Sequence, residues 1–148
     1  MSLLEVPGAR LYYETRGSGP LLLMVPGASG EAGIFKKVTE PLAASYTVLT
    51  YDRRGFSRSQ LDGPQDYDRR LIEQLSGEPA TVFGASSGGI VALEVLTRHP
   101  WVVGTLVTAG AGAMRAAAAE SRCYRGFSIG VTLLSDVAAG HGTEAVSP

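Results

Sequence analysis

Cysteine and lysine are scarce in this sequence of 148 residues, and each shortage excludes a kind of site. Cys123 is the only cysteine, so neither an internal disulfide nor a metal site built on cysteines can form. A single thiol fits a reducing compartment, and we expect a cytoplasmic protein without a metal. The net charge is −1, with no basic stripe and no acidic tail, which argues against a nucleic-acid partner.

Long hydrophobic runs are also missing. The longest weakly polar stretch, residues 101–114, is broken by glycines and is too short to span a bilayer. The N-terminus has no basic segment followed by a long apolar run, so we expect neither a signal peptide nor a membrane partner. Hydrophobic residues nonetheless make up 45% of the chain and charged residues 18%, a composition that can bury the core of one domain.

Strand and helix patterns alternate along residues 1–109. Four apolar runs predict buried strands, at residues 21–25, 46–51, 80–83 and 102–108. Helices are expected between them, at residues 34–44 (with Pro41 as a break), 67–75 and 89–98. An N-terminal hairpin is expected to turn at Pro7-Gly8. This alternation predicts an α/β fold, a mostly parallel sheet with helices on both faces.

The pattern changes after Ala109. Residues 110–148 contain an alanine-rich patch and a possible helix at 129–139, without further strand–helix alternation. We therefore divide the chain into a core, residues 1–109, and a divergent C-terminal tail, residues 110–148, that is helical or partly disordered. A sheet cut after the strand at 102–108 would expose an unpaired edge, so we expect a homo-oligomer through that edge.

The stretch "TVFGASSGGIVALEVL" places a serine between an apolar strand and a helix. Its G-x-S-x-G spacing suits a nucleophile on a sharp strand-to-helix turn, where glycines remove crowding and the helix start offers N–H groups. Ser86 is therefore the candidate nucleophile, and the N–H of Ser87 a candidate oxyanion donor. "GFSIG" matches the same pattern at Ser128, but it follows no buried strand, so Ser128 is expected to be a loop or helix-start residue.

A dinucleotide-binding loop is the rival interpretation of "GASSGGI". The string resembles the loop of short-chain dehydrogenases, but Ile90 stands where their last glycine falls, and the loop does not follow the first strand. The sequence has no Tyr-x-x-x-Lys pair, and no acidic residue near Thr108 could bind a ribose. A nucleotide cofactor is therefore not expected.

Several motifs together resemble the α/β-hydrolase family: "LLLMVPG", "YDRRGFSRS", "TVFGASSGGIVALEVLTRHP" and "VVGTLV" occur in the family's order. The resemblance covers about residues 11–109. It implies an α/β-hydrolase core and hydrolysis of an ester or related acyl bond of a small molecule, through a Ser-His-Asp triad without a cofactor. Pro26 stands where many members have histidine, and the backbone N–H of Ala28 or Ser29 would complete the oxyanion hole. The resemblance also implies that Asp52 braces its loop through hydrogen bonds and an ion pair with Arg53 or Arg54.

Two histidines are available as the base. His99 ends the helix after Ser86, where the helix dipole favours a structural role. His141, in "AGHGTE", resembles the family's histidine loop, and Asp136 as the acid keeps the order Ser, Asp, His. No strand fits between Asp136 and His141, so the alternative is that both lie in a flexible tail.

Two hypotheses on function follow. The first is a serine hydrolase with Ser86 as nucleophile. The second is a catalytically inactive, truncated hydrolase fragment or a binding module, because residues 110–148 are too few for the family's later strand–helix units, each of about 30 residues. We expect an incomplete α/β-hydrolase core.

Overall fold

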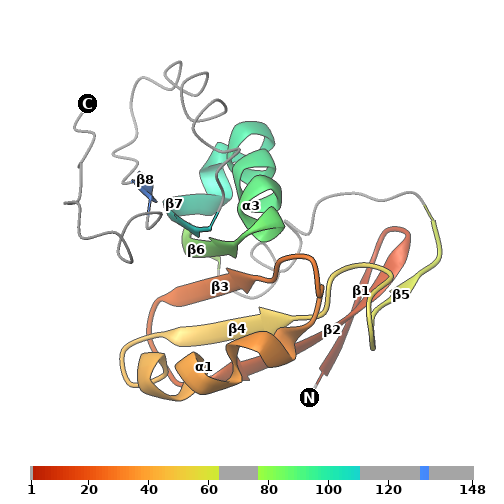
Figure 1. Cartoon of the computed structure of the whole chain (residues 1–148), viewed down its shortest axis with the longest axis horizontal. Helices are drawn as coiled ribbons and strands as arrows, with labels where there is room; N and C mark the ends of the chain where they lie inside the picture. The colour runs from red at the N-terminus through yellow and green to blue at the C-terminus, as the bar shows by residue number, and fades with distance from the viewer. Residues whose placement is uncertain (1, 64–76, 111–130, 134–148) are drawn as a thin grey trace.

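The computed structural model describes residues 2–63, 77–110 and 131–133 (Figure 1). The strands are β1 (Ser2–Val6), β2 (Ala9–Arg16), β3 (Leu21–Val25), β4 (Thr47–Tyr51), β5 (Gln60–Leu61), β6 (Ala80–Ala85), β7 (Val103–Ala109) and β8 (Val131–Leu133). The helices are the 3-10 segments η1 (Ala32–Phe35) and η2 (Pro100–Val102) and the α-helices α1 (Lys36–Leu42) and α3 (Ser87–Arg98). Among the described helices, none is long and apolar enough to cross a membrane.

One mixed sheet contains all these strands, in the order β1-β2-β4-β3-β6-β7-β8, with β5 paired to β2. The five strands from β4 to β8 in this order run parallel to one another. The β1–β2 hairpin and the β2–β4 pair are antiparallel. The predicted turn at Pro7-Gly8 is confirmed, since Val6 pairs with Ala9 and Gly8 adopts a φ of 75°. The sheet is therefore mostly parallel and carries an N-terminal hairpin, as expected.

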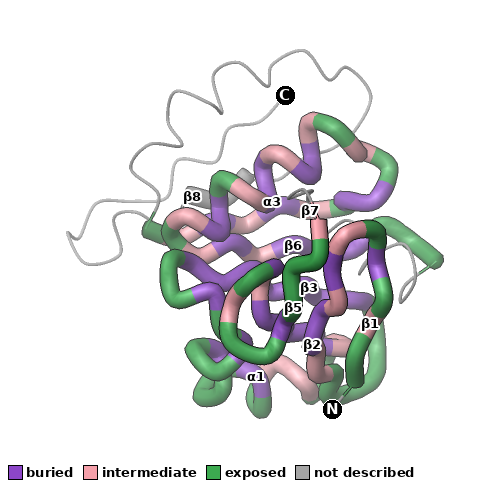
Figure 2. Tube along the Cα trace, turned by 90° about the vertical axis from the view of Figure 1, so that its right-hand side faces the viewer, coloured by how far each residue is buried: buried purple, intermediate pink, exposed green. Residues whose placement is uncertain are grey.

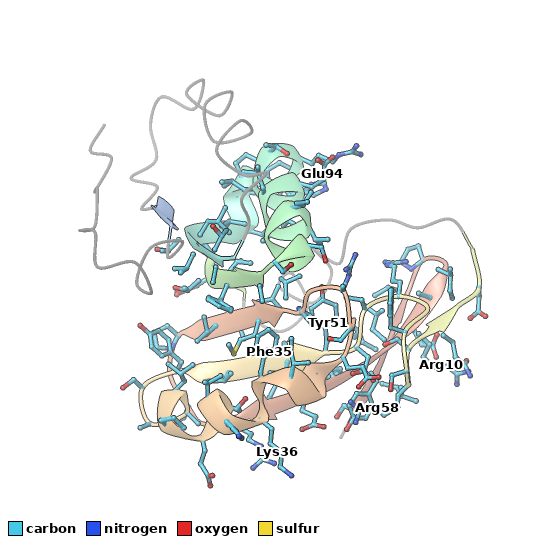
Figure 3. The ribbon with its side chains drawn as sticks, viewed as in Figure 1. Arg10, Phe35, Lys36, Tyr51, Arg58 and Glu94 are labelled. Atoms are coloured by element: carbon cyan, nitrogen blue, oxygen red, sulfur yellow. The ribbon has the colours of Figure 1, made fainter. Side chains whose placement is uncertain are left out.

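Strand β3 is buried on both faces, because alternate residues enter two separate clusters of apolar side chains. Leu21, Leu23 and Val25 pack in the cluster that contains the apolar side of α3. Leu22 and Met24 pack with Phe35 on the opposite face, where Phe35 lies between α1 and the strands (Figure 3). Burial is continuous along β3 (Figure 2). It is nearly continuous along β4, where only Thr47 is half-buried. Helices therefore cover both faces of the sheet, as the alternation predicts.

Pro41 does not break its helix where the sequence suggests. It lies inside α1, which ends one residue later at Leu42, and the irregularity falls earlier, where η1 gives way to α1 at Lys36. A proline near the end of a helix removes only one hydrogen bond, to the carbonyl four residues before it. The chain tolerates this loss because the helix stops there.

Two strands lie where the sequence predicts none. The polar loop after β4 contains β5, which pairs with Ala9 and Arg10 of the hairpin. Strand β8 pairs parallel with residues Leu106 to Thr108 of β7. The expected helix at 129–139 is therefore wrong at residues 131–133, and the expected unpaired edge is wrong at those three residues of β7. The helix predicted at 67–75 lies outside the described residues.

The central strands carry the fold's hydrophobic stabilisation, and Leu49 of β4 tests this. Its side chain is 0% exposed, whereas that of Leu3 on β1 is 55% exposed. Truncation of Leu49 to alanine leaves a cavity, so Leu49→Ala is expected to lower the free energy of unfolding by about 2–5 kcal/mol. The matched change Leu3→Ala is expected to cost less than about 0.5 kcal/mol. Urea unfolding curves measure both, and equal losses would contradict this placement of the core.

Candidate functional site

Ser86 occupies the sharp turn between β6 and α3. Its φ of 51° and ψ of −123° are unusual for a residue with a side chain, a conformation that costs about 1–3 kcal/mol and occurs mainly at functional sites. Hydrogen bonds hold the turn: the N–H of Ser86 donates to the carbonyl of Ala109 at 2.7 Å, and the N–H of Gly89 donates to the carbonyl of Ser86 at 2.9 Å. The residue is exposed. The structure thus presents this serine at the carboxyl end of the parallel strands.

Two glycines let the helix approach the sheet behind Ser86. A Cβ on Gly88 would lie 2.3 Å from the carbonyl oxygen of Val25, and one on Gly84 would lie 2.5 Å from the Cα of Gly89. Neither backbone contact can give way to a side chain. The glycines of the motif "GASSGG" are therefore required by close packing of α3 on β3 and β6.

The loop after β3 lies against Ser86. Val25 of β3 pairs with Gly84 of β6, so the segments that follow these two strands leave the sheet side by side. A Cβ on Gly27 would lie 2.9 Å from the carbonyl oxygen of Ala85 and 3.2 Å from the Cβ of Ser86. Ala28 and Ser29 follow in a turn and are exposed. The structure therefore brings the predicted oxyanion residues, Ala28 and Ser29, into the same neighbourhood as Ser86 and Ser87.

A fully buried carboxylate supports the loops around this site. Oδ1 of Asp52 accepts hydrogen bonds from the N–H of Ala32 and from Nη2 of Arg58, both at 2.8 Å. Oδ2 accepts from Nε of Arg58 at 2.6 Å and from the Arg58 backbone N–H at 3.1 Å. Asp52 thereby joins the loop after β3 to the loop after β4, which confirms its bracing role.

The arginine that pairs with Asp52 is Arg58, and the expectation of Arg53 or Arg54 is wrong. Arg54 instead donates to the carbonyl of Pro7 at 2.8 Å, and Arg53 donates to the carbonyl of Gly27 at 3.4 Å. The sequence does indicate an arginine partner for Asp52, because three arginines follow it within six positions. Their spacing alone does not show which of the three pairs with the carboxylate.

Strand β2 supports Arg58 from the other side. The guanidinium carbon lies 3.5 Å from the ring centre of Tyr12, a cation–π contact, and Nη1 lies 3.5 Å from Oε1 of Glu14 (Figure 3). The Tyr12 hydroxyl donates to Glu14 at 2.6 Å. Burial, together with Glu14, raises the pKa of Tyr12. Tyr12 and Glu14 are members of the supporting network that the sequence did not indicate.

Asp52 is held in its charged form. Burial alone would raise the pKa of Asp52, but the hydrogen bonds from Arg58 and Ala32 and the charge of Arg58 outweigh it, so its pKa lies below the ordinary value. The same hydrogen bond to Asp52 raises the pKa of Arg58. Both partners therefore remain ionised at neutral pH.

The remaining candidates lie away from Ser86 or outside the described residues. His99 follows the last residue of α3, about 20 Å along the helix axis from Ser86 at a rise of 1.5 Å per residue. Its ring packs edge-on against Trp101, which fits the structural role expected for it. His141 and Asp136 lie outside the described residues. In the described part of the chain, no three His, Cys, Asp or Glu side chains gather as a metal site would need.

Comparison with known proteins gives a consistent picture. The family model described as "Alpha/beta hydrolase family" matches residues 22–144. The Uncharacterized hydrolase YraK of Bacillus subtilis (strain 168) is 44% identical over 113 residues, 70% of this chain and 42% of its own. The Zearalenone hydrolase of Cladophialophora bantiana is 30% identical over 111 residues, covering 67% of this chain and 42% of its own.

Solved structures agree with the fold. The crystal structure of an alpha/beta hydrolase from Sphaerobacter thermophilus matches with a TM-score of 0.65 and 29% identity, over 73% of this chain and 44% of that one. The chain thus spans less than half the length of each of these relatives.

The buried carboxylate makes stability depend on pH in a defined direction. The pKa of Asp52 is lower in the folded chain than in the unfolded one, where it is about 3.9. Its contribution to stability is therefore complete above that value and is lost as the pH falls through the folded pKa. Asp52→Asn is expected to be less stable than the wild type at pH 6, with a gap that narrows towards pH 3.

Urea unfolding at both pH values measures this gap. The matched control is Asp62→Asn, because Asp62 is exposed in the same loop; this variant is expected to follow the wild-type curve. A gap that stays constant between pH 6 and pH 3 would show that the Asp52 carboxylate is not stabilised as described.

Proposed function

Because this chain belongs to the alpha/beta hydrolase family, we propose that it hydrolyses an ester or a related acyl bond of a small molecule, with Ser86 as the nucleophile. The observation that carries the proposal is the conformation of Ser86: an exposed side chain at positive φ, on the turn from a parallel strand into a helix. The cost of that conformation is understandable if the hydroxyl must face a substrate.

The proposed reaction has two steps. In the first, Oγ of Ser86 bonds to the acyl carbon, a base takes the hydroxyl proton, and the alcohol leaves with a proton from that base. In the second, water attacks the acyl-serine ester, gives a proton to the base, and releases the acid as the serine recovers its proton. Nothing is oxidised or reduced, so these steps need no cofactor.

The oxyanion formed in each step needs donors close to Ser86. The proposal assigns this role to the backbone N–H of Ser87 and to that of Ala28 or Ser29. The contact between Gly27 and Ser86 supports the assignment, since it brings the loop of Ala28 against the turn that carries the nucleophile. It also explains why Pro26 can replace the histidine common in the family, because the donors belong to the backbone.

We propose His141 as the base and Asp136 as the acid that orients it. Their support is the chain order Ser, Asp, His and the resemblance of "AGHGTE" to the family's histidine loop. We also propose that the reaction takes place in the cytoplasm, on the evidence of a single cysteine.

Labelling by a fluorophosphonate tests the nucleophile. The wild-type chain is expected to react covalently, and Ser86→Ala is expected to lose all labelling, because the reagent bonds to the activated hydroxyl. Ser128→Ala is the matched control, since "GFSIG" repeats the spacing of the motif, and it should label like the wild type. Intact-mass spectrometry measures the adduct. A folded wild type that stays unlabelled would favour the inactive fragment or binding module instead.

Turnover of p-nitrophenyl acetate tests the base. If His141 takes the proton of Ser86, His141→Ala is expected to lower kcat by about 100-fold or more, because general acid–base catalysis typically contributes 10²–10⁴. His99→Ala is the control, since His99 lies at the far end of α3. Absorbance at 400 nm, about the maximum of nitrophenolate, follows the product. Unchanged kcat in His141→Ala would remove this residue from the mechanism.

A further inference from the structure

The peptide unit between Gly27 and Ala28 has a carbonyl at one end, which accepts hydrogen bonds, and at the other end the N–H that is proposed to stabilise the oxyanion. Because the peptide is planar and trans, the Gly27 carbonyl and the Ala28 N–H point in opposite directions. Gly27 lies against the turn of Ser86. A donor that binds the Gly27 carbonyl therefore acts on the same peptide dipole as the Ala28 N–H, at its opposite end.

Two donors bind this carbonyl. The N–H of Gly30 donates to it at 3.0 Å, closing the turn of residues 27–30, and Nη1 of Arg53 donates to it at 3.4 Å. The backbone of Arg53 is fixed to the same loop, since its N–H donates to the carbonyl of Gly30 at 2.7 Å. The guanidinium lies 5.5 Å from the ring centre of Phe56. Arg53 is therefore attached to the loop after β3 by both its backbone and its side chain.

The charge of Arg53 is directed at this peptide. Asp52, the neighbouring carboxylate, is bound to Arg58. Among the described residues, no carboxylate lies within ion-pair distance of the Arg53 guanidinium. At 3.4 Å the contact is longer than the strongest charge-assisted bonds, so the effect of Arg53 on the Gly27 carbonyl is that of a nearby positive charge. A cation at the oxygen end also draws electron density from the peptide, so the N–H at the other end becomes a better donor.

We propose that Arg53 is a positioning residue of the oxyanion hole, which orients and polarises the Gly27–Ala28 peptide so that the Ala28 N–H stabilises negative charge beside Ser86. This proposal rests on the proposed function, because it requires a reaction that develops an oxyanion at Ser86. It assigns a task to the one arginine of "YDRRGFSRS" that neither pairs with Asp52 nor binds the hairpin.

Steady-state kinetics with p-nitrophenyl acetate test the effect on the transition state. Arg53→Gln keeps an N–H donor but removes the charge. Its kcat is expected to fall roughly tenfold, less than the 10²–10³ lost with a direct donor, while KM changes less than about twofold. Inhibition by phenylboronic acid, which forms a tetrahedral adduct with the serine, should weaken by the same factor as kcat. Arg53→Lys should retain more activity than Arg53→Gln.

Arg10→Gln is the matched control, because Arg10 lies on the hairpin, where it binds Gln60 and Glu5 far along the sheet from Ser86 (Figure 3). It is expected to keep the wild-type kcat and KM. A general loss of structure would lower the thermal midpoint and raise KM as well, a pattern that polarisation of one peptide does not produce.

The amide resonance of Ala28 gives a second measurement that does not depend on turnover. In ¹H–¹⁵N spectra, Arg53→Gln should move the Ala28 amide proton to lower frequency, as a weaker donor requires, and Arg10→Gln should leave it in place. If the glutamine variant does not fold, Arg53→Lys carries both measurements, with the smaller changes expected of a displaced charge.

The outcomes separate this inference from the proposed function. A wild type that reacts at Ser86, together with an Arg53→Gln variant of unchanged kcat and unchanged Ala28 resonance, overturns the role of Arg53 alone. A wild type that does not react with the fluorophosphonate overturns both. A drop in kcat with a shift at Ser29 instead of Ala28 also overturns the proposal, because the donor peptide would then be a different one.

Discussion

The buried Asp52 carboxylate fixes the relative position of segments that are far apart in the chain. It binds the start of η1 through Ala32 and the loop after β4 through Arg58. The loop continues to Ser59, whose hydroxyl links the Asp52 carbonyl to the N–H of Tyr12 on β2. A charge removed from water is tolerable only when its hydrogen bonds are made, so the loops must take this arrangement together. The positions of the loops after β3 and β4 therefore depend on the hydrogen bonds of Asp52.

Backbone contacts from three segments hold the unusual conformation of Ser86. The loop after β3, the start of α3 and the end of β7 each contact the turn through backbone atoms. Backbone atoms cannot move aside as side chains can. At Gly84 and Gly88 there is no room for a side chain between α3 and the strands behind it. These contacts surround a serine whose φ and ψ are unusual for a residue with a side chain.

Much of this arrangement is readable from the sequence where local chemistry decides it. Continuous apolar runs identify the strands β3 and β4, and the spacing of glycines around Ser86 identifies the turn. The sequence does not predict a contact for which several residues offer the same chemical group. Arg53, Arg54 and Arg58 all carry a guanidinium, and only the folded loop brings Arg58 to Asp52. The pairing of β8 with β7 joins three residues to a strand that is distant in the sequence, and no local sequence pattern predicts such a pairing. Ser57 shows an intermediate case, since its φ of 45° is a conformation that favours glycine, yet serine occupies the position.

The hydrogen bond from the Ser86 N–H to the Ala109 carbonyl ties the turn after β6 to the end of the neighbouring strand β7. Strand β7 ends beside Ser86, and Gly110 follows it with a φ of 73°. The backbone of Ser86 therefore depends on β7 as well as on its own strand, so a displacement of the end of β7 would also displace the serine.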